Sequence, residues 1–134
     1  MKVVIVIVGL LICLIVVSLL FPTVHVGLSA GPKALAKNDV VQLKTALQAY
    51  LVEYDQPPPG DKATLMKILQ GFNPKKIVFI APEKKQISRD GVFIDPWGSP
   101  YTFGYSTPSY SWAYSFGKNK IDEGGRGDDV NSWE

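Results

Sequence analysis

The C-terminal stretch SFGKNKIDEGGRGDDVNSW, residues 115–133, gathers side chains whose oxygens could bind a hard cation. Ca²⁺ takes six to eight oxygen ligands in flexible geometry, from carboxylates, amides and backbone carbonyls. Glycines at 117, 124, 125 and 127 permit the positive φ angles that turn carbonyls inward. The acids do not alternate as an EF-hand requires, so composition leaves both a calcium loop and a solvated acidic loop open. The oxygen-bearing side chains are Asn119, Asp122, Glu123, Asp128 and Asp129.

Catalytic constellations are missing from the sequence, which predicts that the protein is not an enzyme. The GGRG motif at 124–127 does not connect a strand to a helix, so it is a poor phosphate loop. Asp128 and Asp129 are adjacent, but nothing indicates the cleft that acid–base catalysis would need. His25 is the single histidine, has no partner to orient it, and is interpreted as an interfacial side chain. The net charge of +2 is too small to suggest a nucleic-acid partner, and the basic residues are scattered.

Residues 3–21 form an uncharged apolar run, VVIVIVGLLICLIVVSLLF. As a helix this run would extend roughly 28 Å, close to the thickness of the bilayer hydrocarbon. A cleaved signal peptide is the alternative, but its apolar region is usually shorter, and the nearest cleavage-like motif has Leu28 where a small residue is preferred. The prediction is a retained transmembrane helix. Cys13 lies within it as a small hydrophobe, and its being the sole cysteine excludes an intrachain disulfide.

An amphipathic helix is predicted in residues 22–56, as a continuation of the membrane helix. Its apolar residues recur at steps of three and four, and the prolines at 57–59 end it. Pro22 and Pro32 leave two alternatives: one long kinked helix, which is preferred, or a new helix that begins at Pro32. The residues that set the apolar stripe are Val40, Leu43, Leu47, Tyr50, Leu51 and Tyr54.

Residues 57–134 are predicted to form a globular α+β head. A short helix follows Asp61 and ends near Gly71, and brief β-rich runs occur at 77–80 and 92–94. DPWGSPY, from residue 95, has the residues of a tight turn, and YTFGY and SYSWAYSF then predict an antiparallel hairpin. Its aromatic residues alternate, which predicts one apolar face that covers the second half of the long helix. They are Tyr101, Phe103, Tyr105, Tyr110, Trp112, Tyr114 and Phe116.

The order of these motifs resembles the major pseudopilin of bacterial type II secretion systems, a family related to type IV pilins. The resemblance rests on the apolar helix reaching Pro22, NDVVQLKTALQAYLVEYDQPP, DPWGSPY, YSFGKNKIDEGGRGDD and the terminal NSW. It implies a subunit that polymerises through its N-terminal helix into a helical filament with other pseudopilins. Such a filament is rooted in the inner membrane, with its globular heads in the periplasm, and pushes exoproteins across the outer membrane.

The resemblance also implies Ca²⁺ in the loop 117–129. Backbone carbonyls would come from Phe116 and Arg126, and side chains from Asp128 and Asp129. Asn119 stands where the family usually has an aspartate, and Asp122 would compensate for that lost charge.

The N-terminus departs from the family pattern. When Pro22 and Pro58 are placed on the family's prolines, Met1 falls where the mature chain begins, and Ile5 replaces the family's glutamate. Two expectations remain: a pseudopilin-like filament subunit, or an anchored, calcium-stabilised periplasmic domain that binds a partner without polymerising. A leader ending in glycine in the upstream reading frame would favour the filament.

Overall fold

The computed structural model describes residues 31–107 and 110–133. It contains two α-helices, α2 (Pro32–Tyr54) and α3 (Lys62–Leu69), and the 3₁₀ turn η1 (Lys84–Gln86). Three strands follow, β1 (Thr102–Thr107), β2 (Tyr110–Ser115) and β3 (Val130–Asn131). The α+β class predicted from the sequence is therefore confirmed for the head. The predicted membrane helix at 3–21, and the start of its continuation, lie outside the described residues.

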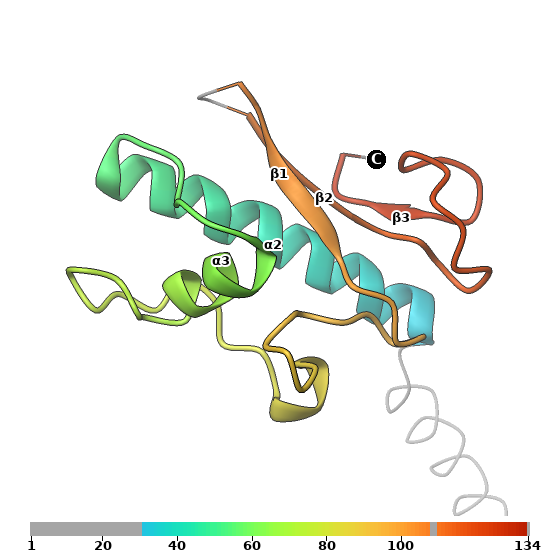
Figure 1. Cartoon of the computed structure of the whole chain (residues 1–134). Coiled ribbons are helices and arrows are strands. Elements are labelled where there is room, and N and C mark those ends of the chain that lie inside the picture. The colour runs from blue at the N-terminus through green and yellow to red at the C-terminus, as the bar shows by residue number, and fades with distance from the viewer. Residues whose placement is uncertain (1–30, 108–109, 134) are drawn as a thin grey trace, which may run out of the picture. The chain divides into compact units, whose positions relative to one another are not determined.

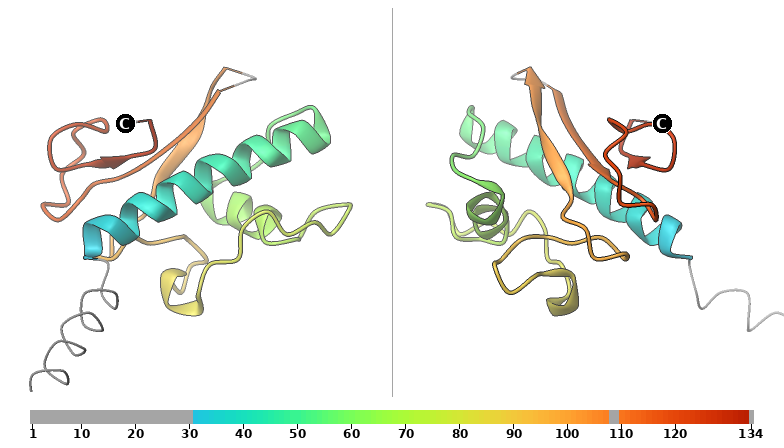
Figure 2. Two further views of the ribbon diagram at one scale, coloured as in Figure 1. Left: turned by 180° about the vertical axis from the view of Figure 1, so that it is seen from behind. Right: turned by 45° about the vertical axis from the view of Figure 1, so that its right-hand side comes forward.

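The helix α2 runs along the whole domain, with the sheet and α3 on one side of it (Figures 1 and 2). It begins at Pro32, which suits the first turn because its missing N–H needs no partner there. It ends before the prolines, where Asp55 takes a positive φ of 55°. Its buried face forms the centre of the core. Among the described residues, no helix is long and apolar enough to cross a membrane. The buried residues of α2 are Ala36, Asp39, Val40, Leu43, Ala46, Leu47 and Tyr50.

The sheet has the antiparallel order β1-β2-β3. The predicted hairpin is confirmed, and Phe103 of β1 lies opposite Ala113 of β2. The third strand was not predicted: it pairs Val130 with Ser115 and Asn131 with Tyr114. Its two residues lack the alternation of a longer strand, so the pairing depends on the loop that brings the chain back to β2.

The prediction that aromatic residues of the hairpin face the helix is confirmed for β1 and wrong for β2. Phe103 is buried, and the Tyr105 hydroxyl donates to the Leu47 carbonyl of α2 at 2.7 Å. In β2 the residues that face the helix are small: Ser111, Ala113 and Ser115 are fully buried. The Ser111 hydroxyl donates to the Lys44 carbonyl at 3.0 Å, so helix and strand lie too close for rings between them. The aromatic residues of β2 are therefore on the outer face of the sheet.

The short helix α3 follows its sequence signals. The Asp61 carboxylate accepts a hydrogen bond from the Thr64 N–H at 2.9 Å as the N-cap. At the other end Gly71 has a φ of 104°, and the Phe72 N–H donates to the Lys67 carbonyl at 3.1 Å, as in a Schellman motif. The β-rich runs are different: the described residues 77–80 form no strand, and residues 92–94 contribute only to isolated bridges.

Asp39 is a buried acid that joins three segments of the core. Its Oδ2 accepts hydrogen bonds from the Tyr101 hydroxyl at 2.7 Å and from the Gln86 side-chain amide at 3.1 Å. Burial raises the pKa of Asp39, and the nearby Glu83 carboxylate acts in the same direction, while the two hydrogen bonds oppose them. The folded protein therefore holds this proton to higher pH than the unfolded chain does.

We expect the Asp39→Asn variant to gain stability relative to the wild type as the pH rises. Proton uptake by Asp39 stabilises the wild type below its ordinary pKa of 3.8, and that stabilisation is lost as pH rises through the higher folded pKa. Asparagine keeps an oxygen for Tyr101 and Gln86 but carries no titrating proton. Urea unfolding of both proteins between pH 3.5 and 7 measures this difference. A difference in unfolding free energy that does not change with pH would contradict it.

Candidate metal-binding loop

The loop from Gly117 to Asp129 connects β2 to β3, and its two ends are held together by that strand pair. Beneath its first residues, the Ser115 hydroxyl donates to Asp95 Oδ2 at 2.6 Å and accepts the Gly117 N–H at 3.0 Å. Asp95 belongs to the DPWG turn, where its other oxygen accepts the N–H groups of Trp97 at 3.0 Å and Ser99 at 2.8 Å. The turn and the loop are therefore parts of one hydrogen-bonded unit.

Two glycines of the loop are required by close approaches of the chain. Gly117 has a φ of 68°, and a Cβ there would overlap the Asp128 carbonyl. Gly125 has a φ of 79°, and a Cβ there would overlap the Trp133 indole. The glycine-rich composition thus serves both the left-handed backbone and the packing of the loop on the residues that follow it.

Asp129, the last residue of the loop, accepts hydrogen bonds from the backbone of the loop. Its Oδ2 accepts hydrogen bonds from the N–H groups of Glu123 at 3.0 Å and Gly125 at 2.7 Å. Its Oδ1 is buried and has no hydrogen-bond partner among the described residues. Leaving a buried acceptor unsatisfied is costly, and the cost is larger for a charged group. A hard cation at this oxygen would remove that cost, so the chemistry of Asp129 fits the implied metal.

Asp128 and Asn119 are hydrogen-bonded to each other across the loop, and both also donate to the Glu123 carboxylate. The Asn119 N–H donates to Asp128 Oδ2 at 2.8 Å, and the Asp128 N–H donates to Glu123 Oε2 at 2.6 Å. The Asn119 amide also reaches Glu123 Oε2, at 3.4 Å. Glu123 is not among the ligands that the family resemblance implies. Its oxygens, within the run of oxygen-bearing side chains, were the only sequence signal for this bridging position.

The remaining residues implied as ligands have other neighbours. The Asp122 Oδ1 accepts hydrogen bonds from the Gly124 N–H at 2.9 Å and from the Tyr114 hydroxyl at 3.1 Å, which places this carboxylate against β2. The Arg126 carbonyl accepts the Asp129 N–H at 2.8 Å. The Phe116 ring lies 6.0 Å from that of Tyr114, centroid to centroid. Within residues 31–107 and 110–133, no three Asp, Glu, His or Cys side chains form a group that could hold a metal ion.

A long helix packed on a small antiparallel sheet, with a glycine-rich loop closing the last strand, is consistent with a pilin-like head. The comparison with protein families agrees: the family model described as Type II secretion system (T2SS), protein G matches residues 25–133. The chain belongs to this family, which makes it a pseudopilin of type II secretion and a structural component of the secretion system. No curated protein and no solved structure matched the chain.

Proposed function

We propose that this pseudopilin is the major subunit of a filament, anchored in the inner membrane with its head in the periplasm, that pushes exoproteins across the outer membrane. The family match and the apolar run at 3–21 support the anchor and the role in secretion. Polymerisation needs a surface by which copies contact one another. The uncovered side of α2 is the surface that best supports this proposal.

The exposed face of α2 is uncharged over four turns. A helix face in contact with water usually carries charged residues. From behind, α2 lies in front of the sheet and α3, so this face is not covered by the rest of the head (Figure 2). Val52, near its end, is 82% exposed. Such a face suits packing against a second helix. The exposed residues between 38 and 52 are Asn38, Val41, Gln42, Thr45, Ala49 and Val52.

Calcium in the loop 117–129 is the second part of the proposal. The unsatisfied Oδ1 of Asp129 supports it, together with the resemblance that implies Asp128, Asn119 and the carbonyls of Phe116 and Arg126 as further ligands. Asp122 would add charge to the same loop. Bound Ca²⁺ would supply positive charge to a buried carboxylate and hold the loop against the strand pair. A loop clamped in this way would give each subunit of the filament a fixed surface.

Photo-crosslinking in membranes tests the filament. With a photoreactive amino acid at Thr45, we expect a ladder of multimers at native expression, because this position lies on the uncharged face of α2. Ala49→Glu on the same face should reduce the ladder strongly, since it would bury a carboxylate between helices. Thr64→Glu, an exposed position on α3, is the matched control and should leave the ladder unchanged.

Monomers alone at native expression would contradict polymerisation. That result would favour the anchored, calcium-stabilised domain that binds a partner without forming a filament. An equal loss of the ladder with Ala49→Glu and Thr64→Glu would contradict the assignment of the contact to α2.

A further inference from the structure

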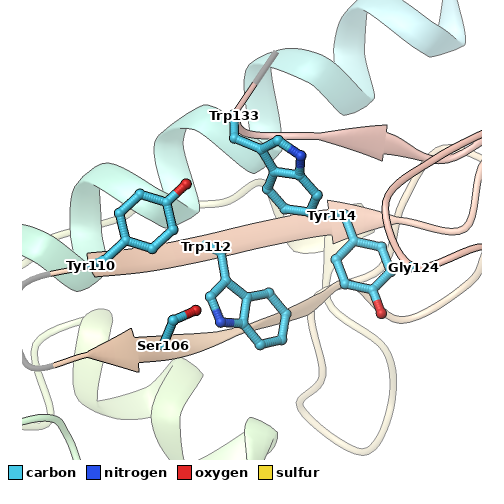
Figure 3. A pocket seen from close by; sticks show the side chains of 6 residues that line it. All are labelled: Ser106, Tyr110, Trp112, Tyr114, Gly124 and Trp133. Carbon is cyan, nitrogen blue, oxygen red and sulfur yellow. The ribbon is translucent and has the colours of Figure 1, made fainter.

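A groove of about 360 Å³ lies on the outer face of the sheet, where the aromatic residues of β2 are directed (Figure 3). It is distinct from the uncharged face of α2, because the sheet separates the two. The rings around it come from β2 and from the end of the chain. The residues that line it are Ser106, Tyr110, Trp112, Tyr114, Gly124 and Trp133.

The rings are held in a preformed arrangement. Trp112 and Tyr114 are stacked, with centroids 5.7 Å apart and 29° between their planes. Trp133 meets Tyr114 edge-on, at 6.0 Å and 73°. Gly104 lies opposite Trp112 in the sheet and leaves room for its indole, as Gly125 does for Trp133. These rings therefore present π faces at two orientations without needing to rearrange.

A carboxylate lies beside the end of the groove formed by Tyr114 and Trp133. The faces of aromatic rings carry partial negative charge and attract cations. The Asp122 carboxylate accepts the Tyr114 hydroxyl at 3.1 Å and is fixed there by the Gly124 N–H at 2.9 Å. The opposite end already contains a cation, since Lys44 Nζ lies 5.3 Å from the centre of the Tyr110 ring. The end formed by Tyr114 and Trp133 is therefore suited to a cationic ligand.

We propose that this groove binds a cationic side chain of a partner protein, with arginine preferred over lysine. A guanidinium is planar, stacks on aromatic faces and can donate to a carboxylate at the same time. Here it would stack on an outward ring face of the groove, next to the Tyr114 hydroxyl that donates to Asp122. Trp133 is 40% exposed, so an extended peptide segment has access to the groove. This surface gives the subunit a contact with other proteins beyond the copies in its own filament.

Nuclear magnetic resonance on the full chain, in nonionic detergent and saturating Ca²⁺, tests the proposal. Titration with acetyl-Gly-Arg-Gly-amide should shift the indole N–H signals of Trp112 and Trp133 saturably. The signal of Trp97, which does not line the groove, should not move. We expect Trp133→Leu to weaken binding by about 2- to 30-fold, the range of a single cation–π contact. Trp97→Phe is the control variant and should bind as the wild type does.

Peptides with norleucine or glutamate in place of arginine separate charge from shape. We expect neither to bind as tightly. Equal binding of the three peptides, or no saturable shift with the arginine peptide, would overturn the proposal. Tighter binding of acetyl-Pro-Pro-Pro-Pro-amide would also overturn it, because the groove would then be a polyproline site. None of these outcomes depends on whether the crosslinked ladder forms.

Discussion

Removing calcium with a chelator is expected to lower the melting temperature of this protein by roughly 10–20 °C. A ligand at 100 times its dissociation constant stabilises the folded state by about 2.7 kcal/mol, and each kcal/mol corresponds to about 4–8 °C in a domain of this size. The effect is large because the buried Oδ1 of Asp129, which has no hydrogen-bond partner among the described residues, would lose the cation beside it. Thermal melts of the full chain in nonionic detergent, with Ca²⁺ or with chelator, measure it.

Asp129→Asn is the variant that connects this effect to the loop. Asparagine keeps one oxygen for the N–H groups of Glu123 and Gly125, but its amide would place a donor where Oδ1 now lies. We expect it to abolish the response to chelator. Asp90→Asn makes the same chemical change at an exposed turn and should retain the response. A wild type that does not respond to chelator, or equal responses from both variants, would contradict calcium binding in the loop.

Replacing Ala113 by leucine is expected to lower the free energy of unfolding by about 1–3 kcal/mol or more. Ala113 is fully buried in the middle of β2, where that strand lies against α2. Extra carbons in a well-packed core force side chains off their rotamers or move the backbone. The Ser111 hydroxyl, bonded to the Lys44 carbonyl, holds strand and helix close and limits such movement. Urea unfolding measures the loss.

Ala34→Leu is the matched control, because it adds the same atoms at an exposed position in the first turn of α2. Surface changes of this kind usually alter stability by no more than about 0.5 kcal/mol. If Ala113→Leu lowered the free energy of unfolding no more than Ala34→Leu does, that result would contradict the close contact between β2 and α2. The outward direction of Trp112 and Tyr114, which depends on that contact, would then lose its physical reason.

Local signals in the sequence predicted the elements whose causes are local. Three- and four-residue spacing identified α2, and the prolines after it set its end. Asp61 and Gly71 marked the limits of α3, because capping needs only the residues of the first and last turns. The hairpin followed from alternation and turn residues. The acids and glycines of residues 117–129 left a calcium loop and a solvated acidic loop both open, and calcium there stays a prediction.

The tertiary structure decided what depends on distance between segments. Alternation says that the aromatic residues of β2 share a face, but either face would satisfy it. The close approach of α2 selected the small residues Ser111, Ala113 and Ser115 for the inside, and so created the aromatic groove. The two residues of β3 carry too little pattern to predict a strand, because its pairing depends on a loop that returns to β2. Within that loop, folding left one oxygen of Asp129 buried and unsatisfied, whereas hydrogen bonds direct Asp122 toward Tyr114. Sequence order cannot distinguish these two acids, since burial and hydrogen-bond partners exist only once the chain is folded.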